Sequence, residues 1–138
     1  MAIIGKEING VRIKFAPAVN REVDPRVIEG LRRAIRADIA EGHVLNEIFL
    51  SSANDQHELS SQDVQGGGKA VDISHINGMK MSVYYASSKS VKAIVDAIQT
   101  AFEGYPHRRE NFGPSFRKKL GAAASIGGHR DHVHLSVN

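Results

Sequence analysis

Two stretches of apolar residues at helical spacing, separated by short strand-like runs, constrain the fold of this chain most strongly. The first predicts an amphipathic helix over residues 25–41 with Asp24 as its N-cap; its apolar positions are Val27, Ile28, Leu31, Ala34, Ile35 and Ile39. The second begins after Ser88 or Ser90 and ends at Gly104; its apolar positions are Val91, Ile94, Val95, Ile98 and Phe102. Each helix must bury its apolar stripe against another layer of secondary structure.

Short runs of strand-forming residues supply that second layer. The expected strands are residues 11–15, 48–50, 70–74, 80–85 and 132–137, with Asn77-Gly78 as a hairpin turn. Residues 105–113 are expected to form an irregular link, and residues 114–120 a short helix. The chain therefore predicts a single α+β domain over residues 1–138, in which two principal helices pack on one side of a mainly antiparallel sheet.

Composition excludes several classes of protein. The 138 residues include no cysteine, so disulfides and thiolate metal sites are excluded and any metal must be bound by His, Asp or Glu. The net charge of +3 comes from scattered basic residues, and we find no helix-turn-helix pattern. We therefore expect no nucleic-acid partner. We also expect no signal peptide and no membrane-spanning segment, hence no membrane partner and synthesis in a cytoplasm.

The richest chemistry lies near the end of the sequence, in Asp131-His132-Val133-His134. Alternate side chains of a strand point to the same face, so His132 and His134 are expected to project together, with the carboxylate of Asp131 beside them. Two imidazoles and a carboxylate are what a metal-assisted hydrolase requires as ligands and base.

A second candidate position lies in the expected core strand 70–74. Asp72 is a carboxylate among apolar residues, which is costly unless it is paired or bound to a metal. His75 is one residue out of step with Asp72 and points to the opposite face unless a bulge intervenes. His57 lies in a polar loop before this strand, and His129 is expected in a loop that leads to the site.

These motifs resemble a known family. The chain is similar to the zinc D-alanyl-D-alanine carboxypeptidases and L-alanyl-D-glutamate endopeptidases, which share a fold with the hedgehog signalling domain. The similar segments are Ser61, Gly66 to Gly68, Ala70-Val71-Asp72-Ile73 and Asp131-His132-Val133-His134. The stretch from Arg108 to Pro114 is similar to phage-encoded members in particular. The likeness covers roughly residues 45–138 and implies a hedgehog-like peptidase fold.

The first half of the family pattern is degraded. At the position of the family's first histidine ligand, strict spacing places Gln65, and a loop with two extra glycines places Asp63. His57 is one candidate for the third ligand and Asp63 is the other; a decayed, purely structural site is the third alternative. The family's substrate-binding arginine is also missing, and Arg109 or Arg130 are the candidates to replace it.

The resemblance implies a zinc peptidase that acts on peptidoglycan peptides, with Zn²⁺ bound by His57, Asp72 and His134. Asp131 would act as general base, and His132 would stabilise the oxyanion or orient the substrate. The expected setting is a phage endolysin or virion-associated wall hydrolase, made in the host cytoplasm and active at the bacterial cell wall, with other phage virion or lysis proteins as partners. The alternatives are a catalytically inactive phage structural module and, more distantly, a metal-dependent nuclease or phosphoesterase.

Overall fold

The computed structural model describes residues 1–54 and 67–138, which form an α+β fold built on one large mixed sheet. In spatial order its strands are β10 (Ala122–Ala123), β9 (Arg117–Lys119), β8 (Arg108–Phe112), β11 (Val133–Val137), β6 (Ala70–Ile76), β5 (Glu47–Ser52), β3 (Val11–Phe15) and β2 (Glu7–Ile8), and β7 (Met79–Lys80) pairs with β6. A separate small sheet pairs β1 (Ala2–Ile3) with β4 (Glu22–Val23).

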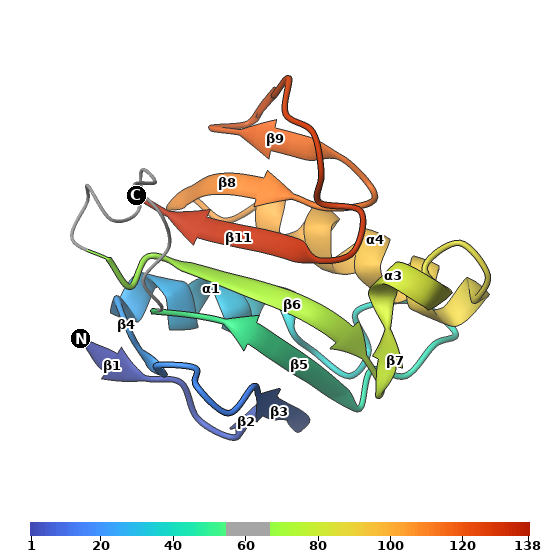
Figure 1. The fold of residues 1–138 in the computed structure, drawn as a ribbon, viewed down its shortest axis with the longest axis horizontal. Helices are drawn as coiled ribbons and strands as arrows, with labels where there is room; N and C mark the ends of the chain where they lie inside the picture. Colours follow the sequence, from blue (N-terminus) through green and yellow to red (C-terminus); the bar gives the residue numbers. More distant parts are fainter. Residues whose placement is uncertain (55–66) are drawn as a thin grey trace.

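The two longer helices, α1 (Pro25–Ala34) and α4 (Lys89–Glu103), lie behind the large sheet, and the short helix α3 (Met81–Tyr84) lies at its edge beside β7 (Figure 1). α1 and α4 contact each other, and both contact β11. The prediction of an α+β fold is confirmed. The sheet is antiparallel at every described strand pair except β3 and β5, which run parallel.

The core lies between the sheet and the two longer helices. The apolar stripe predicted for the second helix is buried along its whole length in α4, and its N-cap is Ser88, whose side chain accepts a hydrogen bond from Val91 N. Each fully buried side chain of this kind contributes about 1.5–3 kcal/mol. α1 approaches α4 closely at Gly30, where a Cβ would lie 2.8 Å from Phe102 Cε1 and 3.0 Å from Tyr105 Cε2. Any larger residue at this position would therefore crowd both rings.

The first helix is shorter than its apolar pattern predicts. Asp24 caps it as expected, but α1 ends at Ala34, and Ile35 already has extended backbone. The side-chain amide of Asn9 donates hydrogen bonds to Arg32 O and Ile35 O, at 2.8 and 3.0 Å. A side chain distant in sequence thus satisfies carbonyl groups that a longer helix would have used, which local pattern analysis does not detect.

Two other stretches differ from their predicted structure. Residues 105–113 and 114–120, expected as a link and a helix, contain β8 and β9, which form a hairpin. Residues 80–85, expected as a returning strand, contain only the end of β7 before α3 begins. The predicted turn at Asn77-Gly78 is confirmed, with positive φ at both residues.

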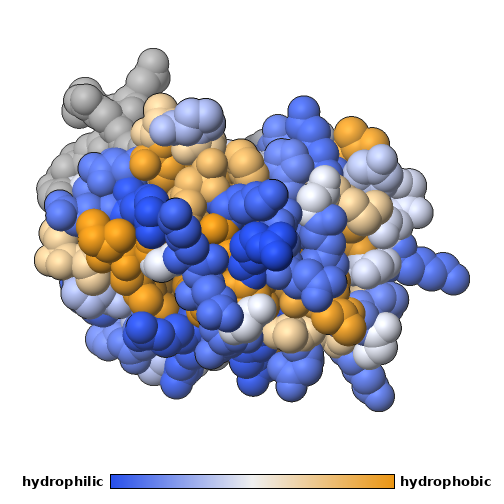
Figure 2. Space-filling model, turned by 90° about the horizontal axis from the view of Figure 1, so that it is seen from below, coloured by the Kyte–Doolittle hydropathy of each residue, from blue (hydrophilic) through white to orange (hydrophobic). Residues whose placement is uncertain are grey.

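On the side seen in Figure 2, hydrophobic residues adjoin one another toward the left and centre, with hydrophilic residues around and between them. None of the helices in the two described ranges has the length and apolar character needed to cross a bilayer.

Candidate functional site

The site lies on the face of the sheet opposite the two longer helices, where four strands place polar and aromatic residues side by side. Asp72 on β6 is paired with His134 on β11, His134 with Phe112 on β8, and Phe112 with Arg117 on β9. Directly paired residues of antiparallel strands point to the same face. Insertion of β11 between β6 and β8 therefore brings Asp72 and His134, 62 positions apart, into contact.

His134 is held between two carboxylates. Its Nδ1 lies 2.8 Å from Asp72 Oδ1, and its Nε2 lies 3.0 Å from Glu110 Oε1. The Ser136 hydroxyl donates to Glu110 Oε1 at 3.2 Å and accepts a hydrogen bond from Glu110 N at 2.9 Å. The side chains of Asp72, Glu110 and His134 are only 18%, 11% and 13% exposed. Each of the three side chains therefore has a hydrogen-bond partner within the largely buried triad.

The two carboxylates control the protonation of the imidazole. Burial alone lowers the pKa of His134, but the hydrogen bonds to Asp72 and Glu110 outweigh burial and raise that pKa to about 9. The hydrogen bond from His134 in turn lowers the pKa of Glu110, against the effect of burial. Without a metal, the cluster is therefore an imidazolium between two carboxylates at neutral pH.

His132 lies beside this triad, one residue before β11 begins. The prediction that the His132 and His134 imidazoles project together stays a prediction. The His132 ring packs against His129, with centroids 4.9 Å apart, and the His129 ring lies 6.0 Å from that of His134. His129 has a positive φ of 62°, which turns the loop back toward the sheet. The loop thus adds two further imidazoles next to the triad.

Asp131 is the accessible carboxylate of this group. Its side chain is 64% exposed, and its Oδ1 lies 2.7 Å from His132 Nδ1. The hydrogen bond from His132 is the main reason why the pKa of Asp131 is lowered. Asp131 is therefore an ionised, water-accessible base whose orientation depends on His132.

His75 shares the face of Asp72 because of a bulge. The register between β5 and β6 shifts after Phe49, which pairs with His75, so that Leu50 pairs with Ile73. The His75 ring packs on Phe49 at a centroid distance of 4.9 Å, and its Nδ1 lies 2.7 Å from Ser74 Oγ. These contacts give His75 a packing role rather than a place in the triad.

The proposed ligands are brought together only in part. Asp72 and His134 meet, whereas His57 and the alternative ligand Asp63 lie outside the described residues. Within residues 1–54 and 67–138, no three His, Asp or Glu side chains are grouped so as to hold a metal ion.

The described pair nevertheless fits zinc in its donor chemistry. A neutral His134 that donates Nε2–H to Glu110 directs the Nδ1 lone pair toward the Asp72 carboxylate, an arrangement that needs a cation or a proton between them. A carboxylate behind the other ring nitrogen is also the usual support of a zinc-bound histidine. Two donors on tetrahedral zinc lie about 3.3 Å apart, so the pair at 2.8 Å would need to separate only slightly.

Glu110 and Ser136 are the residues that the motif analysis missed. Glu110 falls in the stretch expected to form an irregular link, and its place beside His134 depends on β8 pairing with β11. A buried polar network fixes β8 against α4: Asn111 Nδ2 donates to Gln99 O, and Gln99 Nε2 donates to Asn111 Oδ1. The position of Ser136, two residues after His134 on the same strand, is a signal that could have been used.

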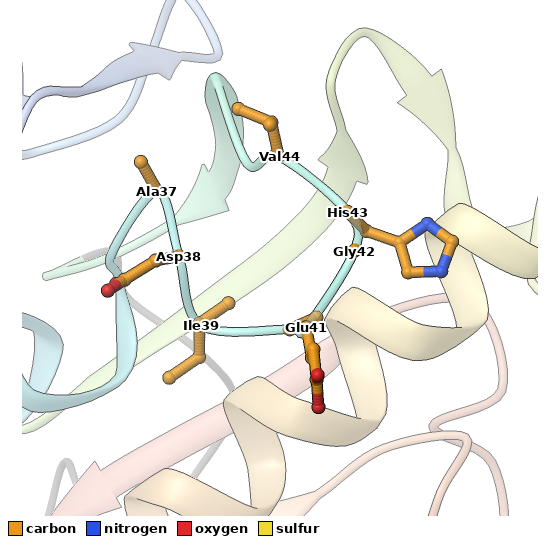
Figure 3. Close-up of a pocket in the computed structure, with 8 residues that line it drawn as sticks. Ala37, Asp38, Ile39, Glu41, Gly42, His43 and Val44 are labelled. Carbon is orange, nitrogen blue, oxygen red and sulfur yellow. The ribbon is translucent and has the colours of Figure 1, made fainter.

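A hollow elsewhere in the structure gathers no comparable chemistry. It has a volume of about 760 Å³ and lies in the loop that joins α1 to β5 (Figure 3). Its polar side chains, Asp38, Glu41 and His43, point away from one another. The triad on the sheet is therefore the better candidate site.

Comparisons with known proteins assign no family to this chain. No protein-family model, curated protein or solved structure matches the chain. What the site does must therefore be inferred from its own geometry.

Proposed function

We propose that this chain is a zinc-dependent peptidase that acts on peptidoglycan peptides, with the hedgehog-like fold that its motifs resemble. The supporting observation is the contact of Asp72 with His134 across β6 and β11, backed by Glu110 on the second ring nitrogen. The two groups lie within reach of one ion, and the carboxylate behind the imidazole orients the lone pair of Nδ1. His57 or Asp63 would complete the ligand set.

In this proposal Asp72 and His134 bind the metal, and the neighbouring loop supplies the acid–base chemistry. Zinc bound there would act as a Lewis acid. Asp131 accepts the proton of the attacking water and later donates it to the leaving amine. His132 holds the Asp131 carboxylate through Nδ1 and offers its other ring nitrogen to the oxyanion or to the substrate.

The setting proposed for this activity is that of a phage endolysin or a virion-associated wall hydrolase. Such a protein would be made in the host cytoplasm and would act at the bacterial cell wall, together with other phage lysis or virion proteins. Release of peptides from purified peptidoglycan tests the substrate, and incubation with DNA tests the nuclease alternative. Digestion of DNA with no action on peptidoglycan would contradict the proposal.

Metal binding is the first test. We expect the purified protein to carry one zinc ion per chain, and we expect Asp72→Ala or His134→Ala to lose it, since each removes a donor atom. Elemental analysis measures the zinc, and circular dichroism checks the fold. His107→Ala is a matched control, because His107 packs against Tyr105 away from the site and its loss should leave zinc unchanged. Full zinc content in the Asp72 or His134 variant would rule out the assignment.

A second candidate function follows from the same triad. Because both ring nitrogens of His134 already face carboxylates, the cluster satisfies itself through a proton and needs no metal to be stable. This favours a catalytically inactive phage structural module that keeps the peptidase fold. Such a module would carry no stoichiometric zinc and would release no peptides from the wall, so the same two measurements separate the candidates.

A further inference from the structure

The large sheet ends at β10, and within the two described ranges no strand pairs with the outer edge of β10. Ala122 and Ala123 are exposed, and the run from Ala122 to Gly128 contains no charged residue and no proline. Charged residues and proline are the usual means by which a protein protects an edge strand from pairing. At the opposite end of the sheet, by contrast, β2 carries Glu7 beside Lys6. The edge at β10 is therefore open to pairing with another strand.

The register of the hairpin formed by β9 and β10 shows which backbone groups face outward. Ala124 N donates to Arg117 O at 3.0 Å, and the preceding residue, Ala123, is paired with Lys118. Directly opposite residues of an antiparallel pair alternate between those that exchange both hydrogen bonds and those that exchange none. Ala123 is therefore at a position without hydrogen bonds to β9, so its N–H and C=O point away from β9. An incoming extended segment can pair with both groups.

The lysines of β9 give this edge a positive charge. Lys119 and Lys118 are paired with Ala122 and Ala123, so one lysine lies on each face of the hairpin. Neither lysine forms an ion pair with a residue that the structure describes, and the Nζ of Lys118 lies 5.1 Å from the ring centroid of Phe116. A strand added to β10 would lie about 10 Å from β9. Because the alanine side chains between them are small, a lysine and an acidic residue of that strand can approach each other across β10.

We propose that the outer edge of β10 binds an extended acidic segment of a partner protein, which adds one strand to the sheet. The main chain of Ala123 supplies the hydrogen bonds, and Lys118 and Lys119 select acidic side chains. A second copy of this chain fits less well, because two β10 edges side by side would bring the lysines of both copies together. The interaction goes beyond the proposed peptidase function and does not depend on zinc.

The test uses three peptide probes on the isotope-labelled full chain, followed by nuclear magnetic resonance at low ionic strength. The first is an eight-residue peptide of alternating Thr and Glu. The second has Lys in place of Glu, and the third is the acidic peptide with every amide nitrogen methylated, which keeps the charge but cannot donate hydrogen bonds. We expect the first peptide to bind at least about fivefold more tightly than either other peptide, because only it offers both charge and a strand edge.

The position of binding is measured in the same titration. The amide signals of residues 122–125 should shift, exchange of the Ala123 amide with solvent should slow, and added salt should weaken the binding. Equal binding of all three peptides, equal binding of the acidic peptide and its methylated form, or no binding of the acidic peptide would overturn the proposal. Binding that leaves the exchange of the Ala123 amide unchanged would overturn it as well.

Variants separate the backbone contribution from the charge. Ala123→Pro removes the outward N–H without removing a hydrogen bond to β9, and it should weaken binding of the acidic peptide at least about fivefold. Joint replacement Lys118→Glu and Lys119→Glu should reverse the preference toward the basic peptide. Lys89→Glu is the matched control for charge, because Lys89 is exposed at the start of α4, and it should keep the preference for the acidic peptide.

The lysine variants decide if Ala123→Pro does not fold. An unchanged preference in the folded double lysine variant, or a lost preference in Lys89→Glu, would contradict the proposal. A dimer in sedimentation that Ala123→Pro abolishes would assign the edge to a second copy and would overturn it too. These outcomes are independent of the peptidase proposal, because no variant changes a residue of the triad or of its neighbouring loop.

Discussion

At the scale of single residues, the surroundings of His134 determine what the site can do. Asp72 and Glu110 approach opposite ring nitrogens, so one nitrogen faces the place for a cation and the other is anchored. A lone histidine in an apolar strand would ordinarily be a satisfied core residue. Here the carboxylate on each side makes it either a metal ligand or the centre of a buried ion cluster, and both roles depend on its protonation.

The stability of the zinc-free protein should reflect that protonation. The ordinary pKa of 6.5 applies to His134 in the unfolded chain, and the two carboxylates raise it to about 9 in the folded protein. The folded state therefore binds more protons between these values, so the free energy of unfolding should fall as the pH rises from about 6.5 to 9. Urea denaturation at several pH values measures this, with His134→Gln as a control that should lose this part of the slope. If the free energy of unfolding rose between about pH 6.5 and 9 in the natural protein but not in the His134→Gln variant, the prediction would be contradicted.

A variant of Asp131 can distinguish a loss of catalysis from a loss of metal binding. We expect Asp131→Asn to keep zinc and the fold, because Asp131 is exposed and its described contact is with His132 rather than the triad. The amide cannot accept the proton of water, so turnover of peptidoglycan peptides should fall by about 10²-fold or more. Peptide release and elemental analysis on the same sample provide the two readouts. Undiminished release would remove Asp131 from the role of base.

At the scale of elements, the close approach of α1 and α4 supports the sheet from behind. Gly30 allows this approach, and the ring of Tyr105 next to it is anchored through its hydroxyl, which donates to Arg26 O at 2.9 Å. The ring therefore cannot move aside to make room for a larger residue. The same helices fix β8 and β11, which carry Glu110 and His134.

Gly30→Ala tests this packing. Alanine is favoured over glycine inside a helix by about 1 kcal/mol, but overpacking a rigid contact costs about 1–3 kcal/mol. We expect a net loss of stability of about 1 kcal/mol in urea denaturation. Gly127→Ala is the matched control, since no atom lies within 4 Å of the Cβ it adds, and its stability should stay within about 0.5 kcal/mol of the parent. A Gly30 variant as stable as the control would show that the helices can separate at no cost.

The strands illustrate why β8 and β9 escaped prediction while β3, β5 and β6 did not. The last three have apolar residues at regular intervals, which is the pattern that indicates a half-buried strand. β8 is Arg108-Arg109-Glu110-Asn111-Phe112, and its inward polar residue, Asn111, is satisfied by Gln99 of α4 instead of by apolar packing. A strand whose core contact is a hydrogen bond has no hydrophobic period to detect.

At the scale of the whole molecule, the order of the strands creates the site. The last strand enters the sheet between β6 and β8, so residues from three separate parts of the chain meet at His134. The same order places the β8–β9 hairpin, with Arg117, at the edge of that face. The triad therefore joins residues that are spread over much of the sequence.

The sequence alone determined the α+β class, the helix caps at Asp24 and Ser88 and the turn at Asn77-Gly78. It also singled out Asp72 and His134 as candidate site residues. Each of these features depends on nearest neighbours or on a short chemical motif. Only the tertiary structure decided where α1 ends and that Glu110 supports His134. These features depend on hydrogen bonds between residues far apart in the chain, whose energies no local pattern contains.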